Sequence, residues 1–502
     1  MNRRKILFLN SIVVLLTTAI NVVFGLIEVR LFIYKYGTDI NGLLQTGNQL
    51  MSYVALLEAG ISASYVYSLY KPIADNDFQH ISNLFVGFKN NIRRTIVVML
   101  LGATIISAVY PLVIRNTNIS YITMFSVFSL VSIKAIVPYF FTYVPKYMII
   151  AAEKKYISDI IICSTKSITY IIEILLMTYS PIPIQLILLM SAVIIALSGI
   201  PFRYFMNKVY KGMINKEADP DNSPQSMVKD VLPHNLSSLV FNSTDNIVLS
   251  ILTSLNTVTV YSSYNLIVSQ VNSIFQSIFD GVTASFGIKI AKKDSNSYSA
   301  YTELLIGTNF IATIVSTVFV VMINDFVMLW IGEEYVVKFY NCTMFGLIMY
   351  CSCVLPCISA ARNACGLYKE SKKYVIAQAI TNLLITIILT PLIGLSGALI
   401  GTLFARIVVG LPFNFRLVQK AAFKNEDSRW YVFPVSILLI IIISTSLSRF
   451  IPLIKCNSNS LFVLFIIHTL VASFFTIIIV CTAFLFFFDF RRLVKQILKR
   501  KG

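Results

Sequence analysis

The sequence predicts an all-α integral membrane protein with about 14 transmembrane helices, arranged as two pseudo-symmetric six-helix bundles and two further C-terminal helices. Composition supports this class, since 57% of the 502 residues are hydrophobic, 13% are charged and the mean hydropathy is +0.77. Apolar runs of about 20 residues recur along the chain, and each is long enough to cross a hydrocarbon core of roughly 30 Å as a helix. An internal repeat predicts the two similar bundles.

The repeat is carried by one short motif and by the segment before it. Ala59-Gly-Ile-Ser-Ala-Ser-Tyr65 recurs as Asp280-Gly-Val-Thr-Ala-Ser-Phe286, an offset of 221, and Asn21 corresponds to Asn242 at the same offset. The glycine of each motif favours close helix packing over a hinge. Because each copy has an even number of predicted spans, both enter the membrane in the same direction, which predicts parallel repeats with a ligand path between the bundles.

Apolar runs between polar breaks define the predicted spans and domains. The spans of the first copy are 6–29, 40–69, 95–114, 119–144, 157–179 and 182–205. The spans of the second copy are 233–255, 258–289, 301–323, 337–361, 374–393 and 395–417, and two unpaired spans follow at 432–450 and 460–488. The predicted domains are an N-terminal bundle 1–205, a polar cytoplasmic linker 206–232, a C-terminal bundle 233–418, the extra helices 419–488 and a basic tail 489–502.

The distribution of Lys and Arg predicts the orientation, because positive residues are retained on the cytoplasmic side. With the N-terminus inside, 32 of the 41 Lys and Arg residues lie in inner segments and six in outer loops, so both termini are expected in the cytoplasm. The charged N-terminus precedes a long apolar run without a cleavage site, which indicates a retained first span. Scattered charges argue against nucleic acid as a partner, and the tail from Arg491 to Lys501 is expected to bind anionic inner-leaflet lipid.

Three cations lie deep inside predicted spans, away from the span ends that are counted with the loops: Lys134, Lys166 and Arg406. Each costs about 2.5–3.5 kcal/mol at a helix centre on insertion scales, so the fold has to supply partners or a wet cavity. Lys134 and Arg406 lie roughly 15 Å from the inner ends of their spans, further than a snorkelling side chain comfortably reaches. We therefore expect these cations to face a cavity.

Three acids within the spans are candidates for ion coupling. Asp159 and Glu173 lie seven residues on either side of Lys166, so the three share one slowly drifting helix face. Two roles remain open for these acids, compensation of the lysine charge and coupling of transport to an ion. Asp245 lies in the polar cluster Asn242-Ser-Thr-Asp-Asn246 and is a coupling group or a partner for a buried cation.

Five segments in a fixed order carry a resemblance to a known family. They are Tyr36-Gly-Thr-Asp-Ile-Asn-Gly42 with Glu58-Ala-Gly-Ile-Ser-Ala-Ser64, Asn242-Ser-Thr-Asp-Asn-Ile-Val248 with Tyr261-Ser-Ser-Tyr264, Leu329-Trp-Ile-Gly-Glu-Glu-Tyr335, Gly366-Leu-Tyr-Lys369, and Asn382 with Pro391-Leu-Ile-Gly-Leu-Ser-Gly-Ala-Leu-Ile-Gly-Thr402. In this order they resemble the Wzx-type O-antigen and capsule repeat-unit flippases, the polysaccharide-exporter branch of the multidrug/oligosaccharidyl-lipid/polysaccharide (MOP) flippase superfamily. The two final helices depart from twelve-span relatives and resemble the fourteen-span arrangement of lipid II flippases.

The resemblance implies a V-shaped, MATE-like carrier in the bacterial cytoplasmic (inner) membrane. Its implied substrate is an undecaprenyl-diphosphate-linked oligosaccharide, moved to the outer leaflet for O-antigen, capsule or exopolysaccharide assembly. Transport is expected to be coupled to H⁺ or Na⁺ without a bound cofactor, and a polysaccharide polymerase and a chain-length regulator are expected as further partners. On this basis Lys134, Lys166 and Arg406 are the expected ligands of the diphosphate head, with Arg30 at the outer mouth.

Two alternative functions fit the same kind of chain less well. A multidrug exporter of this superfamily exchanges cationic drugs and favours acidic cavities, whereas this chain buries cations. A membrane-embedded polymerase or acyltransferase is disfavoured because the outer loops are short and only three histidines occur, of which His468 stands alone in an apolar span and is expected to pack in the core. The sequence contains no GxxxxGK[ST] loop for ATP, and its eight cysteines lack the paired spacing of a metal site.

Overall fold

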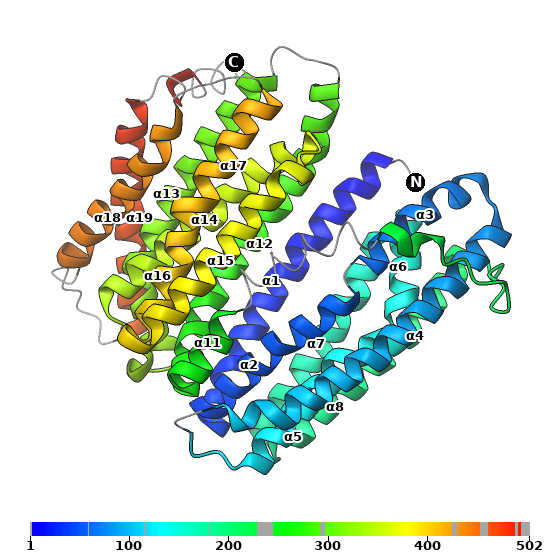
Figure 1. Cartoon of the computed structure of the whole chain (residues 1–502). Helices are drawn as coiled ribbons and strands as arrows, with labels where there is room; N and C mark the ends of the chain where they lie inside the picture. Colours follow the sequence, from blue (N-terminus) through cyan, green and yellow to red (C-terminus); the bar gives the residue numbers. More distant parts are fainter. Residues whose placement is uncertain are drawn as a thin grey trace. The chain divides into compact units, whose positions relative to one another are not determined.

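The computed structural model describes residues 3–58, 60–114, 117–179, 181–227, 244–291, 297–423, 429–451, 460–486 and 490–492. Every regular element in these ranges is helical (Figure 1), which confirms the predicted all-α class. Ten helical segments among the described residues are long and apolar enough to cross a membrane, and they coincide with ten of the predicted spans. The chain is therefore a multi-pass membrane protein.

The other four predicted spans fall on helices outside that set of ten. These helices are α1 (Arg3–Tyr36), the pair α2 (Thr38–Ala55) and α3 (Ile61–Asp75), α11 (Asp245–Leu252) and α12 (Leu255–Ala291). Helix α11 covers only the end of the span predicted at 233–255, because residues 228–243 lie outside the described part of the chain. The end of the predicted linker and most of the predicted tail lie outside it as well.

Contacts within the chain divide it into two compact units, unit 1 from Met1 to Thr259 and unit 2 from Val260 to Gly502. The boundary falls near the start of α12, so unit 1 contains α1 to α11 and unit 2 contains the rest of α12 and the later helices. The five domains expected from the sequence stay a prediction.

Unit 1 is a bundle of long helices with an apolar core. Its further helices are α4 (Phe78–Val109), α5 (Tyr121–Phe141), α6 (Tyr143–Ala151), α7 (Lys155–Tyr179), α8 (Ile184–Leu197) and α9 (Gly199–Val209). Helix α1 packs against α7, and α5 packs against both α4 and α8. Tyr65 and Phe88 are fully buried and stack with ring centroids 4.9 Å apart, whereas Leu101 and Ile105 on α4 are exposed. Apolar residues on both faces are typical of helices that contact neighbours on one side and lipid on the other.

Helices α2 and α3 are separated by a break at Gly60. A short 3₁₀ turn covers Leu56–Glu58, and Gly60 has φ 101°, a left-handed conformation that a residue with a Cβ rarely adopts. The buried Glu58 carboxylate accepts a hydrogen bond from Ser62 N at 3.1 Å in the first turn of α3. Gly60 therefore lies between two helices, a position that the packing motif did not predict, and its role in helix packing stays a prediction. The matching Gly281 lies inside α12, which is continuous.

The polar segment after α9 docks on the ends of α3 and α4. The Asp221 carbonyl accepts a hydrogen bond from the Tyr65 hydroxyl at 3.1 Å, and Gly87 permits this approach because a Cβ there would overlap the same carbonyl oxygen. His80 Nε2 lies 3.3 Å from Asp221 Oδ2, and Ser223 N donates to Oδ1 at 2.8 Å. Burial raises the pKa of the Asp221 carboxyl, but these hydrogen bonds outweigh burial and hold the pKa below its ordinary value.

Unit 2 combines a second bundle with two appended helices. Its helices after α12 are α13 (Ser297–Trp330), α14 (Phe339–Ala364), α15 (Tyr368–Ile393), α16 (Leu395–Phe404), α17 (Leu411–Leu417), α18 (Val432–Phe450) and α19 (Leu461–Leu485). Helix α14 is buried along most of its length and packs against α13. Helices α18 and α19, which have no counterpart in the repeat, also pack against α13.

The helix that continues from α16 changes its hydrogen-bonding pattern in mid-span. Residues Ala405–Gly410 form a π-helical segment, η5, between α16 and α17. Such turns are rare and occur frequently at functional sites. Gly410 at the end of η5 packs against α15, where a Cβ would lie 2.9 Å from Gln378 Nε2. Arg406 is the second residue of this segment.

Candidate functional site

Two of the predicted site residues meet in the interior of unit 1. Lys134 on α5 and Glu173 on α7 form an ion pair, with Nζ 3.1 Å from Oε1. The Glu173 side chain is almost fully buried and also accepts a hydrogen bond from Ser191 Oγ on α8. The seven-residue spacing predicted Glu173 beside Lys166, but the structure places it against a lysine on another helix. Three helices therefore converge on one carboxylate.

Glu28 on α1 joins this ion pair and is not among the residues predicted from the sequence. Its carboxyl lies within hydrogen-bonding reach of Glu173 and close to Lys134. Tyr170 on α7 lies beside both carboxyls and stacks on Phe24 of α1, with ring centroids 5.7 Å apart. Two carboxyl groups this close repel each other when both are ionised, so a proton or another cation between them is favoured. The sequence could have indicated Glu28, since it is the one acidic residue within the first predicted span, 6–29.

Lys166 lies apart from the two acids expected to accompany it. It is 11 residues from the start of α7, a rise of about 16 Å, and its side chain is exposed on the surface of unit 1. Among the described residues no ion pair joins Lys166 to a carboxylate. Asp159 is half-buried on the same helix. Seven residues correspond to about 10 Å along a helix axis, which is too far for direct contact.

Arg406 is fixed by α14 within unit 2. Its Nη1 donates hydrogen bonds to the Ile348 carbonyl at 3.1 Å and to Ser352 Oγ. The side chain is half-buried, and it projects from the π-helical segment η5. A guanidinium carries five N–H donors in a planar fork, the geometry that binds two phosphate oxygens at once.

Asp245 is the buried first residue of α11 in unit 1. The adjoining Thr244 hydroxyl lies 2.7 Å from the Tyr53 hydroxyl of α2. Asn246 N donates to Gln49 Oε1, also on α2, at 3.1 Å. The described part of the polar cluster, Thr244 to Asn246, therefore contacts α2.

Arg30, expected at the outer mouth, is exposed on α1. Further along the same helix, Lys35 Nζ donates to the carbonyl oxygens of Met177 at 2.8 Å and Leu176 at 3.3 Å. These bonds join the end of α1 to the end of α7. Arg30 is thus carried on a helix that is fixed at its C-terminal end.

His468 on α19 is buried, as expected for a core residue, but it does not stand alone. Its Nδ1 lies 4.0 Å from Asp325 Oδ2 on α13. The two side chains line a cavity of about 230 Å³ in unit 2, together with Asn324 and Ser448. Within the described residues, no group of His, Cys, Asp and Glu side chains has the arrangement of a metal site.

Long apolar helices with charged side chains inside the predicted spans define a multi-pass helical membrane protein. A multidrug resistance MATE family transporter of the MOP superfamily, in its inward-facing conformation, aligns with a TM-score of 0.64 and 13% identity, over 83% of this chain and 100% of that chain. The lipid II flippase MurJ, in its inward closed conformation, aligns with a TM-score of 0.66 and 12% identity, over 96% of this chain and 100% of that chain. A MATE transporter from Vibrio cholerae, VcmN, gives a TM-score of 0.51 and 14% identity, over 86% and 98%.

These similarities confirm the MATE- and MurJ-like transporter fold expected from the sequence. No family model and no curated protein sequence matches the chain. The alignment with MurJ covers more of this chain than the alignments with the two MATE transporters do, and the share it leaves out is smaller than α18 and α19 together. The MurJ-like fold therefore includes residues of the appended helices.

Proposed function

We propose that the protein is a flippase that moves undecaprenyl-diphosphate-linked oligosaccharide repeat units from the cytoplasmic to the outer leaflet of the bacterial inner membrane. The observation that carries the proposal is the exposed side chain of Lys166 in the middle of α7, with no carboxylate paired to it in the described part of the chain. In hydrocarbon such a lysine costs about 2.5–3.5 kcal/mol on insertion scales. A water-filled path that accepts a diphosphate removes this cost and uses the charge.

Arg406 is the second proposed ligand of the diphosphate. Its guanidinium is positioned by Ile348 and Ser352, and charge-assisted bonds from a guanidinium to phosphate are among the strong hydrogen bonds in proteins. Arg30 remains a candidate ligand near the outer end of α1. Lys134 was expected to bind the same head group, but its ion pair with Glu173 favours a role in the coupling cluster.

The cluster of Glu28, Lys134 and Glu173 is the proposed site for H⁺ or Na⁺. Its three side chains come from α1, α5 and α7, so the binding of a cation changes the attraction between three helices at once. A change of helix packing in response to one bound ion is what ion-coupled alternating access requires. Asp159 and Asp245, the other predicted coupling groups, do not belong to this cluster.

A multidrug exporter is the second candidate function, because two of the solved structures with this fold are multidrug resistance and MATE transporters. The acidic cluster of unit 1 is compatible with the exchange of a cationic drug for an ion. The exposed Lys166 and the fixed Arg406 favour an anionic substrate instead. The two functions are separated by the charge of the transported molecule.

The test is transport by the purified protein in liposomes. A fluorescent polyprenyl-diphosphate oligosaccharide is incorporated, and its movement between leaflets is followed with a membrane-impermeant quencher. We expect movement by the wild type and a loss of about tenfold or more in Lys166→Ala and Arg406→Ala, since a hydrogen bond to a charged group contributes about 1.5–3 kcal/mol. Lys208→Ala, which removes an exposed lysine at the end of α9, is the matched control.

Two results would contradict this assignment in different ways. Counter-transport of ethidium without movement of the diphosphate lipid would replace the flippase function with multidrug export. Movement of the lipid at the wild-type rate in both alanine variants would remove Lys166 and Arg406 from the site.

A further inference from the structure

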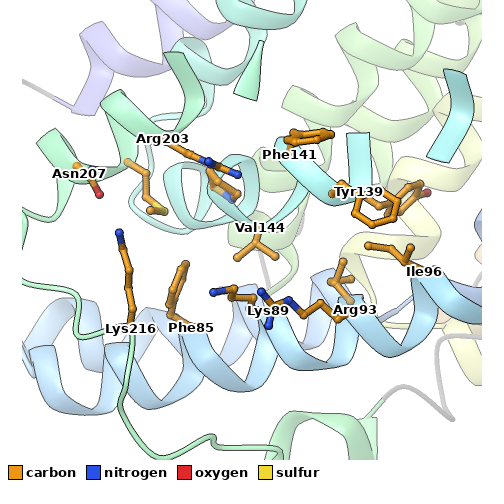
Figure 2. A pocket seen from close by; sticks show the side chains of 14 residues that line it. Phe85, Lys89, Arg93, Ile96, Tyr139, Phe141, Val144, Arg203, Asn207 and Lys216 are labelled. Carbon is orange, nitrogen blue, oxygen red and sulfur yellow. The ribbon is translucent and has the colours of Figure 1, made fainter. Parts of the chain in front are cut away.

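A second cationic site lies in unit 1, at a different place from Lys166 and from the coupling cluster. It is a cavity of about 380 Å³ between α4, the region where α5 passes into α6, and α9 (Figure 2). Its volume falls within the range of about 300–1,000 Å³ that is usual for pockets that bind small molecules. None of the roles assigned above uses this cavity.

Four positively charged side chains surround the cavity. Lys89 and Arg93 come from α4 on one side, Arg203 comes from α9 on the other, and Lys216 comes from the segment after α9 (Figure 2). No carboxylate lines the cavity, and no ion pair involves these four residues in the part of the chain that the structure describes. Four like charges around one cavity repel each other, so an anion between them is strongly favoured.

The rest of the lining is apolar and aromatic. Phe85 is buried at the cavity wall, and Phe141 and Tyr139 line the end nearer the apolar part of α4. The basic residues of α4 end at Arg94, and the rest of the helix is uncharged and mostly apolar. This pattern predicts that the cavity lies at the height where the membrane surface meets hydrocarbon. An occupant that satisfies both parts of the lining has an anionic head and an apolar body.

We propose that this cavity binds the phosphate group of an anionic phospholipid from the leaflet that contacts the polar end of α4. Arg93 and Arg203 supply planar forks for phosphate oxygens, and Lys89 and Lys216 act as point charges. Asn207 offers an amide donor at the head-group end. The positive-inside pattern predicts that this leaflet is the cytoplasmic one, where anionic lipids attract basic side chains.

The experiment is a lipid titration of the full-length, delipidated protein in neutral detergent, followed by native mass spectrometry. Phosphatidylglycerol is compared with phosphatidylcholine, undecaprenyl phosphate and inorganic phosphate. The test variant combines Lys89→Gln, Arg203→Gln and Lys216→Gln. The control combines Lys369→Gln, Lys372→Gln and Lys373→Gln, which removes three exposed charges from an open cavity of unit 2 that also contains Glu370.

We expect the wild type and the control to prefer phosphatidylglycerol to phosphatidylcholine by about tenfold or more. In the test variant the affinity for phosphatidylglycerol should fall by about a hundredfold, because each cation near an anionic lipid contributes about fivefold. Arg203→Gln alone replaces one exposed cationic side chain and should reduce the affinity for phosphatidylglycerol by about fivefold. This single variant tests the proposal if the triple variant fails to fold.

Three outcomes would overturn the proposal. Equal phosphatidylglycerol binding by the test variant and the control would show that the cavity is not the site. Displacement of the lipid by an equal concentration of inorganic phosphate would assign the cavity to a soluble anion. Stronger binding of undecaprenyl phosphate than of phosphatidylglycerol would assign it to a polyprenyl lipid.

Discussion

Replacing Lys134 by methionine is expected to destabilise unit 1, because it leaves the Glu173 carboxylate buried without its ion-pair partner. Glu173 is 1% exposed and its Oε1 lies 3.1 Å from Lys134 Nζ. Removal of one partner from a buried ion pair costs about 3–5 kcal/mol. The double variant Lys134→Met with Glu173→Gln removes the uncompensated charge and keeps a group that can accept the bond from Ser191. It should therefore recover most of the lost stability.

The assay has to report on unit 1, and the sequence provides a probe for it. Both tryptophans, Trp330 and Trp430, lie in unit 2, whereas Cys163 on α7 is the cysteine of unit 1. Thiol labelling of Cys163 during heating, read by peptide mass spectrometry, follows unit 1, and tryptophan fluorescence follows unit 2. With about 2–4 °C per kcal/mol for a unit of this size, the Cys163 midpoint should fall by about 6–20 °C in Lys134→Met.

Two results would refute this reasoning. One is a Cys163 labelling midpoint in Lys134→Met that equals that of the wild type. The other is a double variant whose fall in the Cys163 midpoint equals the sum of the falls in Lys134→Met alone and Glu173→Gln alone, because additivity means that the two side chains do not interact.

Three further predictions concern the backbone break, the docked linker and the proposed ligand. Gly60→Ala forces a side chain into a left-handed conformation and should lower the Cys163 midpoint, at a cost of about 1–2 kcal/mol, whereas Gly102→Ala, at a helical position with open space around it, should not. Because the pKa of Asp221 is lowered, its carboxylate stabilises the docked linker at neutral pH, and this contribution is lost as the pH falls through the lowered pKa. Hydrogen exchange in the linker should therefore differ between wild type and Asp221→Asn at about pH 6 but not at about pH 2. A difference that persists in acid would contradict this prediction. Arg406→Lys keeps the charge but loses the planar fork, so lipid movement should slow by about tenfold in the liposome assay while the fold is retained, and an unchanged rate would exclude two-point phosphate binding.

The long helices are predictable from the sequence because a helix that faces lipid has to be apolar along about 20 residues, whatever its neighbours are. The break between α2 and α3 is not predictable in this way. The same glycine motif occurs in both copies of the repeat, yet the chain breaks at Gly60 and continues as one helix through Gly281. The glycine motif alone therefore does not determine the backbone conformation.

Lys134 and Glu173 of the cluster were predicted from the sequence as site residues, but Glu28 and the pairing of the three side chains were not. Lys134 and Glu173 both stand out in the sequence because charged residues in apolar spans are expensive. Spacing along one helix identifies neighbours on that helix only, and it placed Glu173 on the same face as Lys166. The observed contact joins α5 to α7, and Glu28 enters from α1, so the cluster depends on which helices pack together. That choice is made by side-chain fit over whole helix faces.

The π-helical turn of η5 sets the direction in which the side chains of the following helix, α17, point around the helix axis. Arg406 and Asn414 are eight residues apart, and in an uninterrupted α-helix they would point about 80° away from each other. The larger number of residues per turn in η5 reduces that angle, and both side chains reach α14, Arg406 at Ile348 and Asn414 at Arg362 Nη1, 3.0 Å away. A single-residue deletion in η5 would rotate α17 about its axis and turn Asn414 away from Arg362. The extra residue of the π-helical turn therefore allows both Arg406 and Asn414 to contact α14.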